Sequence, residues 1–475
     1  MNAVISIQSS GRRIDISFDG TESGLWKRVG QELLTCKIPD VIRVSCLGDT
    51  AELKVGRRGS YTKDGVEYPS MLVRAWNNIC LPSSVYKKVY LTCVNPESNN
   101  YKAYIMTPCD SRHFSAQYGS IDDVAAGRAR MVKTPYESYL YWIRYYEKLS
   151  KGYVDQSDVY FPEVSANSDD GKTDSSAASD ADRELYSLLF AMAKNLVSKV
   201  CAIPPTAKLV EKAHAIFDRM CRRRKVETFN ADLKELIALV PRKRNPLLDN
   251  VADFFAKDKK DFAKIVTREE NLLAAMKAVT NKGGEHGSFA ASDIDVFPAN
   301  KKQEDEVMSM LGAHLRPMVS RIWRVKPHAQ EEKFSAYCKA HGIKRIKKFW
   351  HGSRNENWAS IILNSLEIHP NARITGKMFG MGIYFAPSPS KSFGYTSYHG
   401  TRWAGGHSDV GFMGIFATAL GESYEPTGAM NAEPAMRRAG KDSVYAYANK
   451  TGLMNDEVIF YNEDAVVLNY LVEFK

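Results

Sequence analysis

Between residues 161 and 183 the sequence consists largely of Ser, Ala and Asp, with almost no bulky apolar side chain. Such a segment cannot bury enough apolar surface to offset the entropy of ordering its backbone, so we predict a flexible acidic linker there. With 475 residues, the chain is also longer than the roughly 250–300 residues at which single hydrophobic cores stop growing. We therefore expect several domains, arranged on both sides of this linker.

The hydrophobic pattern differs on the two sides of the linker. Before it, short alternating runs at residues 12–18, 41–46 and 89–94 predict strands, and residues 135–149 form one amphipathic pattern typical of a helix. After it, apolar residues recur with the helical period in four segments, which are residues 185–200, 207–220, 230–240 and 269–279. Prolines separate these segments, and a pattern of strands and turns returns from residue 343 onward.

The overall composition is that of a globular protein, with 44% hydrophobic and 25% charged residues. No apolar run reaches the roughly 18 residues of a membrane helix, and the N-terminus lacks the pattern of a secretory signal. We expect a soluble intracellular protein, nuclear if the source is eukaryotic. The eight cysteines are scattered without C-x-x-C spacing, so we predict reduced thiols and no metal site.

A formal net charge of +10 favours a polyanionic partner such as nucleic acid. Basic residues cluster at positions 222–225 and 242–244, both near predicted helix ends. Cations at a helix C-terminus interact favourably with the helix dipole, which is one interpretation of these clusters. The alternative is a nuclear-import or nucleic-acid-binding patch.

Four short segments of the C-terminal part carry residues suited to chemistry. They are residues 349–354 (FWHGSR), 375–386 (TGKMFGMGIYFA), 390–395 (SKSFGY) and 455–461 (NDEVIFY). The glycines at positions 376, 380 and 382 do not form G-x-G-x-x-G, and they precede an apolar strand-like run rather than a helix. A Rossmann dinucleotide site is therefore disfavoured.

In order and spacing, these four segments resemble the catalytic domain of the poly(ADP-ribose) polymerases, across residues 343–475. That family carries H-G-S, then G-x-x-x-G-x-G-I-Y-F-A, then S-K-S-x-x-Y, then a glutamate before the last strands. The resemblance implies a split, mostly antiparallel β-sheet fold that binds NAD as a substrate. It also implies an enzyme that transfers ADP-ribose from NAD and releases nicotinamide.

The resemblance assigns a role to each matching residue. His351 would bind the adenosine ribose, the main chain of Gly352 and the hydroxyl of Ser392 would bind the nicotinamide carboxamide, and Tyr384 and Tyr395 would enclose the nicotinamide ring. The implied NAD-binding set is His351, Gly352, Ser353, Tyr384, Lys391, Ser392 and Tyr395. The implied catalytic set is Glu457, His351 and Tyr384.

Glu457 is the residue on which activity should depend. Cleavage of the N-glycosidic bond of NAD develops an oxocarbenium-like centre, and a carboxylate bound to the ribose stabilises that charge in the transition state. Nicotinamide leaves as a neutral group, so no metal is required. The same carboxylate is placed to accept the proton of the acceptor hydroxyl.

Two upstream regions resemble modules that accompany these enzymes. Residues 86–160 are similar to a WGR domain, except that Tyr118, Gly119 and Ser120 replace its naming tripeptide, so its arginine is missing. Arg128 and Arg130 lie nearby and either replace that arginine or serve a structural role. Residues 184–280 resemble the helical regulatory domain of DNA-dependent members.

The predicted organisation is a multidomain α+β protein. It comprises a β-rich module (1–85), a WGR-like domain (86–160), an acidic linker (161–183), a helical regulatory domain (184–280) and an ADP-ribosyltransferase domain (281–475). We expect a DNA-responsive poly(ADP-ribose) polymerase that modifies protein acceptors, including itself, in the DNA damage response, with no membrane partner. A mono-ADP-ribosyltransferase and a nucleic-acid-responsive scaffold with a weakly active or inactive fold remain the alternatives.

Overall fold

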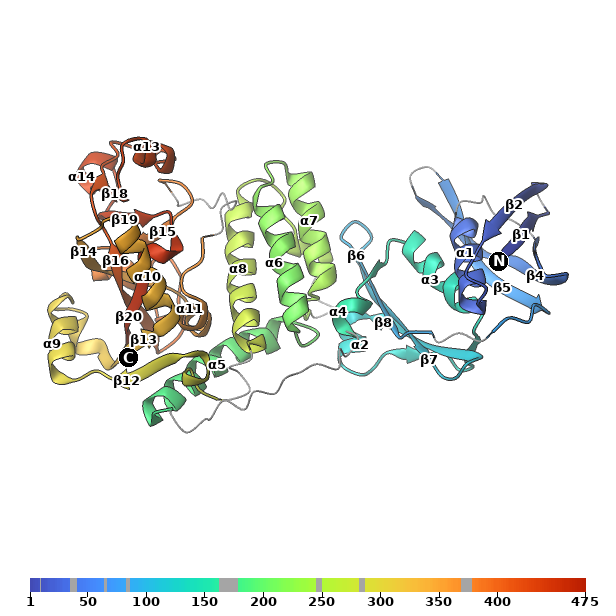
Figure 1. The fold of residues 1–475 in the computed structure, drawn as a ribbon, viewed down its shortest axis with the longest axis horizontal. Helices are drawn as coiled ribbons and strands as arrows, with labels where there is room; N and C mark the ends of the chain where they lie inside the picture. The colour runs from blue at the N-terminus through green and yellow to red at the C-terminus, as the bar shows by residue number, and fades with distance from the viewer. Residues whose placement is uncertain are drawn as a thin grey trace. The chain divides into compact units, whose positions relative to one another are not determined.

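The structure is a computed structural model (Figure 1) that describes residues 1–8, 10–34, 41–63, 66–82, 86–161, 178–244, 250–281, 287–368 and 378–475, with the backbone alone for 54–76. The chain divides into two compact units, Met1–Ala166 with Ile237–Phe254, and Asn167–Leu236 with Phe255–Lys475. Both units are mixed α+β and contain antiparallel sheets, as the sequence predicted. The predicted linker falls mostly on residues 162–177, outside the described residues. The bounds of the five predicted segments stay predictions.

The first unit begins with a five-stranded antiparallel sheet in the order β2-β1-β3-β4-β5 and one helix, α1 (Glu22–Leu34). Its strands are β1 (Asn2–Ile7), β2 (Arg12–Ser17), β3 (Val41–Cys46), β4 (Asp49–Lys63) and β5 (Val66–Asn77). Helix α1 was not predicted from the sequence, and its interior contains Gly30. A Cβ at Gly30 would lie 3.1 Å from the backbone oxygen of Trp142, so this glycine permits close packing against the helix that carries Trp142.

A second sheet of the first unit has the order β10-β8-β7-β6-β11, with β9 paired to β8. Its strands are β6 (Val89–Asn95), β7 (Asn100–Pro108), β8 (His113–Ser120), β9 (Arg130–Met131), β10 (Tyr136–Glu137) and β11 (Val154–Asp155). The helices are α2 (Ile121–Ala125), α3 (Leu140–Ser150) and α4 (Ser157–Tyr160). The predicted start of a helix at residue 135 is wrong, because Tyr136 and Glu137 pair with β8 and α3 begins only at Leu140.

The basic cluster at positions 242–244 is partly buried within the first unit. Arg242 is buried, and its backbone oxygen accepts a 2.7 Å hydrogen bond from the Tyr101 hydroxyl. Arg244 forms a 3.1 Å ion pair with Asp122, and both side chains are less than 10% exposed. Arg242 and Arg244 are thus not presented on the surface as a basic patch, and this favours a structural role for these two residues of the cluster.

Four long helices lie at the segments where the helical period predicted them, all in the second unit except the end of α7, whose residues from Ile237 belong to the first unit. They are α5 (Asp180–Val200), α6 (Ala207–Cys221), α7 (Val226–Leu239) and α8 (Asp261–Thr280). Figure 1 shows α6, α7 and α8 side by side. Phe229 of α7 stacks on Phe262 of α8 with ring centroids 4.0 Å apart, and Arg219 of α6 binds Asp232 of α7 at 2.8 Å. None of the described helices is long and apolar enough to cross a bilayer.

Two sheets follow the helices in the second unit. The larger has the order β12-β13-β20-β16-β14, with bounds β12 (Ile294–Pro298), β13 (Val319–Pro327), β14 (Ile346–Gly352), β16 (Gly411–Ala419) and β20 (Val466–Phe474). The smaller has the order β15-β19-β18-β17, with bounds β15 (Ile383–Phe385), β17 (Ser423–Tyr424), β18 (Ser443–Ala446) and β19 (Glu457–Phe460). Pairing is antiparallel except between β17 and β18.

The core of the larger sheet lies at β16 and β20, which are buried at every position. The connecting helices are α9 (Lys301–Ser309), α10 (His328–Ala340), α11 (Trp358–Asn364), α12 (Pro389–Phe393), α13 (Glu433–Arg438) and α14 (Ala448–Thr451). Strands β12 and β13 join this sheet, so strands return earlier than residue 343, where the sequence pattern placed their return. Asp, Arg and Lys interrupt the apolar pattern of these two strands, so the sequence pattern did not reveal them.

Candidate active site

The four sequence motifs meet where the two sheets of the second unit join. Trp350 in β14 and Ala386 after β15 form a backbone bridge, with both N–H groups donating to the partner carbonyl at 3.2 and 3.0 Å. Strand β15 also pairs with β19, which begins at Glu457. The first three residues of the glycine-rich motif, 375–377, lie outside the described residues.

His351 is oriented by the neighbouring motif. Its Nδ1 lies 3.0 Å from the backbone oxygen of Tyr384, and its half-buried ring meets the rings of Phe385 and Phe416 edge to face. Because a carbonyl oxygen only accepts, Nδ1 must carry the proton. In the neutral imidazole, Nε2 is therefore an acceptor.

Gly352 is required by a close backbone approach. A Cβ at this position would lie 1.8 Å from the backbone oxygen of Ser392, which no side chain can tolerate. Ser392 is buried and donates a 3.0 Å hydrogen bond to the backbone oxygen of Trp350, so α12 is fixed against β14. Ser353 follows directly and accepts a 3.0 Å hydrogen bond from Asn357.

The two tyrosines of the predicted ring sandwich are held differently. The hydroxyl of Tyr384 donates to the Gly380 oxygen at 2.7 Å and accepts from the Phe379 N–H at 3.1 Å. Tyr395 is 42% exposed and stacks on Trp403, with ring centroids 6.1 Å apart and planes 21° apart. Burial raises the pKa of both tyrosines, and the charge of Glu457 raises it further, so both rings stay neutral at physiological pH.

Glu457 and Lys391 form a buried ion pair. The Nζ of Lys391 donates to Oε1 of Glu457, and the side chains are 11% and 9% exposed. The second carboxylate oxygen, Oε2, is buried without a hydrogen-bond partner among the described residues. Because a buried carboxylate oxygen without a partner is costly, Oε2 is suited to accept a hydrogen bond from a ligand.

A chain of hydrogen bonds joins helix α8 to this site. Asn357 donates at 2.9 Å to the side chain of Asn271 in α8 and at 3.0 Å to Ser353. The sequence analysis did not identify Asn271, Asn357 or Trp403. Asn357 lies three residues beyond the first motif and could have been included with it, whereas an asparagine on a helix and a tryptophan in a loop carry no such signal.

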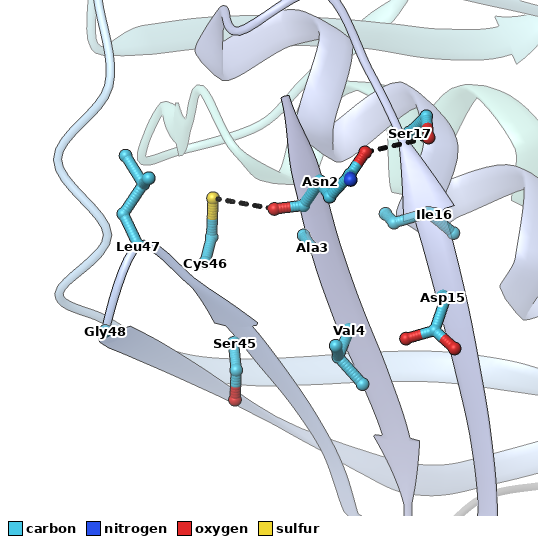
Figure 2. Close-up of a pocket in the computed structure, with 10 residues that line it drawn as sticks. All are labelled: Asn2, Ala3, Val4, Asp15, Ile16, Ser17, Ser45, Cys46, Leu47 and Gly48. Carbon is cyan, nitrogen blue, oxygen red and sulfur yellow. Dashed lines mark hydrogen bonds between the residues drawn. The ribbon is translucent and has the colours of Figure 1, made fainter.

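The site is distinct from the hollow of the N-terminal sheet. Figure 2 shows that hollow, which lies over β1, β2 and β3 and is lined by polar groups such as Asp15 and Cys46. It belongs to the first unit and contains no residue of the four motifs. Within the described residues, no group of three or more His, Cys, Asp or Glu side chains could hold a metal ion.

The two joined sheets bring a histidine, two tyrosines and a buried Lys–Glu pair to one junction. Residues 301–452 match the family model of the poly(ADP-ribose) polymerase catalytic domain. This match, together with the relatives below, supports the poly(ADP-ribose) polymerase family. The matched range contains all predicted site residues except Glu457, which lies just beyond it.

Three curated relatives illustrate the similarity. A putative poly [ADP-ribose] polymerase-like protein, 100L, of Invertebrate iridescent virus 6 is 27% identical over 161 residues, which are 32% of this chain and 83% of that protein. Poly [ADP-ribose] polymerase 2-A of Oryza sativa subsp. japonica is 32% identical over 182 residues, covering 32% of this chain and 26% of that protein. Protein mono-ADP-ribosyltransferase PARP3 of Mus musculus is 34% identical over 132 residues, covering 27% of this chain and 22% of that protein.

The similarity is thus confined to one part of each chain. The match spans most of the viral protein but only about a quarter of the rice and mouse proteins. The family-model match begins at residue 301, so it includes neither of the two upstream regions.

Proposed function

We propose that this protein transfers ADP-ribose from NAD to protein acceptors and releases nicotinamide. The observation that carries the proposal is the Glu457 carboxylate, which is buried, bound by Lys391 through Oε1 and without a described partner at Oε2. It lies near enough to Tyr384 and Tyr395 for its charge to raise the pKa of both. A ribose hydroxyl next to a ring held by these tyrosines would satisfy Oε2.

The surrounding residues fit the other parts of NAD. The main chain of Gly352 and the Ser392 hydroxyl would bind the carboxamide, and glycine suits this because it lets a ligand approach the backbone. The Nε2 of His351, an acceptor in the neutral ring, would bind a hydroxyl of the adenosine ribose. Ser353 and Lys391 would line the same site.

The chemistry follows from these positions. The bond between the ribose carbon and the nicotinamide nitrogen breaks, nicotinamide leaves with both electrons as a neutral molecule, and positive charge grows on the ribose. Glu457 stabilises that charge more strongly in the transition state than in the ground state. The acceptor oxygen then bonds to the same carbon, and its proton passes to the carboxylate.

Polymer formation and single transfer are separated by one assay. The protein is incubated with NAD labelled in its adenylate part and analysed on a denaturing gel. We expect a smear of modified protein that is lost in Glu457→Gln, which would support a poly(ADP-ribose) polymerase. A sharp labelled band would indicate a mono-ADP-ribosyltransferase, and absence of label would contradict catalysis.

We propose further that the helices of the second unit restrain the site. The Asn271–Asn357–Ser353 hydrogen bonds connect α8 to the residue after Gly352, and Lys277 of α8 pairs with Glu367. If a bound activator loosened these helices, the population would shift toward an NAD-competent state. This is the role that a helical regulatory domain would have.

DNA is the activator that the charge favours. On the second sheet of the first unit, the exposed Arg130 in β9 pairs in register with Tyr118 in β8, which is 40% exposed. Arg128, in contrast, forms a 3.3 Å ion pair with Asp123, and Ser120 caps α2. We therefore assign the contact with a phosphate backbone to Arg130 rather than to Arg128.

The test compares nicotinamide release with and without double-stranded DNA at several salt concentrations. We expect stimulation that weakens as salt rises and falls in Arg130→Ala but not in Arg12→Ala, an exposed arginine of the other sheet. Salt-sensitive DNA binding with negligible nicotinamide release would instead support the scaffold alternative.

A further inference from the structure

The loop between α12 and β16, residues 394–410, is held in one conformation by internal hydrogen bonds. Thr396 and Thr401 are buried and bonded to each other, because the Thr401 hydroxyl donates to the Thr396 oxygen at 2.9 Å. The same hydroxyl accepts from the Gly406 N–H at 3.0 Å, and the backbones of His399 and Ser408 are joined at 2.9 Å. The tip of the loop is therefore held in place from within.

The loop is also fixed to the residues that follow the first motif. Arg354 donates to the Ala404 oxygen at 2.8 Å. The Asn355 side chain donates to the Val410 oxygen at 2.9 Å, and its N–H donates to the Ser397 hydroxyl at 2.9 Å. Residues next to Gly352 thus determine where this loop lies.

Trp403 is the residue that this arrangement presents to the site. The backbone N–H of Trp403 donates to the Gly394 oxygen at 3.0 Å, and a Cβ at Gly394 would lie 2.7 Å from Cδ1 of the Trp403 indole. The indole stacks on Tyr395, and the guanidinium of Arg402 lies 4.8 Å from its ring centroid. Trp403 remains 50% exposed, so it is not a core residue placed there by burial.

The two tyrosines of the site differ in how their rings are held, and this difference indicates a role for the stack of Trp403 on Tyr395. Tyr384 is locked by two hydrogen bonds of its hydroxyl, whereas the hydroxyl of Tyr395 has no hydrogen bond among the described residues. A half-exposed ring without such a bond samples several rotamers unless a neighbour restricts it. The neighbour that stacks on the Tyr395 ring is Trp403.

We propose that Trp403 is a positioning residue that holds the Tyr395 ring ready to stack on nicotinamide, and so sets the affinity for the nicotinamide end of NAD. The inference rests on the proposed function. Stacked aromatic pairs contribute beyond their burial and prefer offset parallel geometry, which the 21° interplanar angle approaches. Arg402 adds a cation–π contact that holds the indole itself.

The test measures NAD turnover and the inhibition constants of nicotinamide and of ADP-ribose for Trp403→Ala and Trp403→Phe. In Trp403→Ala we expect the KM for NAD and the inhibition constant of nicotinamide to rise about three- to tenfold, with kcat changed less than about twofold. The inhibition constant of ADP-ribose, which lacks the nicotinamide ring, should stay unchanged. Trp403→Phe retains a ring that can stack and should recover most of the affinity.

A double-mutant cycle tests whether Trp403 acts through Tyr395. When Trp403→Ala is added to Tyr395→Ala, the inhibition constant of nicotinamide should not rise further. Phe297→Ala, which removes another exposed aromatic ring of the second unit, controls for a general effect of losing such a ring. If Trp403→Ala does not fold, Trp403→Leu retains bulk without a stacking face and is compared with Trp403→Phe instead.

Three results would overturn the inference: unchanged nicotinamide inhibition in the Ala or Leu variant, equal weakening of ADP-ribose, or an additive effect in the cycle. The first of these, with a raised KM for the acceptor protein, would identify Trp403 as an acceptor contact. Measurements on the wild-type enzyme distinguish a failure of the positioning role from a failure of the proposed function. Absence of nicotinamide release in wild type contradicts the proposed function, whereas normal release with an unaffected Trp403→Ala contradicts only the positioning role.

Discussion

Lys391 and Glu457 form an ion pair in which both side chains are almost fully buried, at 11% and 9% exposure. Removing one partner leaves the other charge buried and unpaired, which costs much more than the pair itself contributes. Lys391→Met should therefore lower the free energy of unfolding by about 3–5 kcal/mol. Urea denaturation measures this change.

Two variants control for that prediction. Lys450→Met breaks an ion pair with Glu425 whose side chains are 47% and 44% exposed, so it should leave the stability nearly unchanged. The double variant Lys391→Met with Glu457→Gln removes both charges and should recover most of the lost stability. No recovery would mean that Lys391 stabilises the fold through its packing rather than through the Glu457 charge.

Asn271 should restrain NAD turnover from helix α8. Asn271→Ala removes the acceptor of the 2.9 Å hydrogen bond from Asn357 and frees Asn357 from the helix. One hydrogen bond contributes about 0.5–1.5 kcal/mol, so basal nicotinamide release without DNA should rise about two- to tenfold. Asn195→Ala, at an exposed position of α5, should leave the basal rate as it is.

A larger change tests the same restraint. Deleting residues 185–279 should raise basal nicotinamide release above that of the full chain. If the truncated protein folds and is no faster without DNA, the helices do not act as a gate.

Gly352 should tolerate no side chain. In Gly352→Ala the new Cβ would meet the Ser392 oxygen at 1.8 Å, so β14 or α12 must move. Overpacking of this kind costs about 1–3 kcal/mol, and the shift displaces the groups that would bind the carboxamide. We expect a lower free energy of unfolding and at least about tenfold weaker nicotinamide inhibition. Gly428→Ala, where a Cβ meets nothing within 4 Å, is the matched control.

Lys148 should make the stability of the first unit depend on pH. Its Nζ lies 4.0 Å from the Tyr104 ring centroid, and burial lowers its pKa to about 8 from the usual 10.5. Between these values the unfolded state binds more protons than the folded state, so the free energy of unfolding rises with pH. Below about pH 8 the lysine is charged in both states and its full burial penalty applies.

A variant separates the effect of Lys148 from that of the buried tyrosines. Once the tyrosines of the unfolded chain lose their protons at high pH, they lower the free energy of unfolding, whereas Lys148 raises it. Lys148→Met should be more stable than wild type near about pH 7, and the difference should shrink toward about pH 10. Lys148→Arg stays charged over this range, so its deficit relative to Lys148→Met should stay constant. A constant difference between wild type and Lys148→Met would contradict the lowered pKa.

The sequence could predict a candidate site because its residues lie in short motifs with a fixed order, and the structure brings these motifs together. Local periodicity also located the four long helices of the second unit. Contacts between segments far apart in the sequence could not be predicted from local patterns. Nothing near Trp403 indicates that a loop returns it to Tyr395, and Gly30 made α1 look unlike a helix until its packing against α3 was visible.

Helix α3 gives a second example, in which the local sequence pattern misplaced the start of an element. An amphipathic pattern continues through Tyr136, but that residue pairs with Phe114 in β8, so tertiary pairing overrides the local pattern. The altered tripeptide at Tyr118–Ser120 shows that local sequence is also a limited guide to function. The resemblance predicts an arginine where this chain has Ser120, and the cap that Ser120 forms on α2 became visible only in three dimensions.

The most direct test of the central claim is nicotinamide release by Glu457→Gln, measured beside NAD binding by the same variant. Glutamine keeps the shape of the side chain and removes the charge that would stabilise the transition state. We predict a loss of about 10²–10³ in kcat with NAD binding weakened less than about threefold. Turnover close to that of wild type would contradict the assignment of Glu457 and, with it, the proposed mechanism.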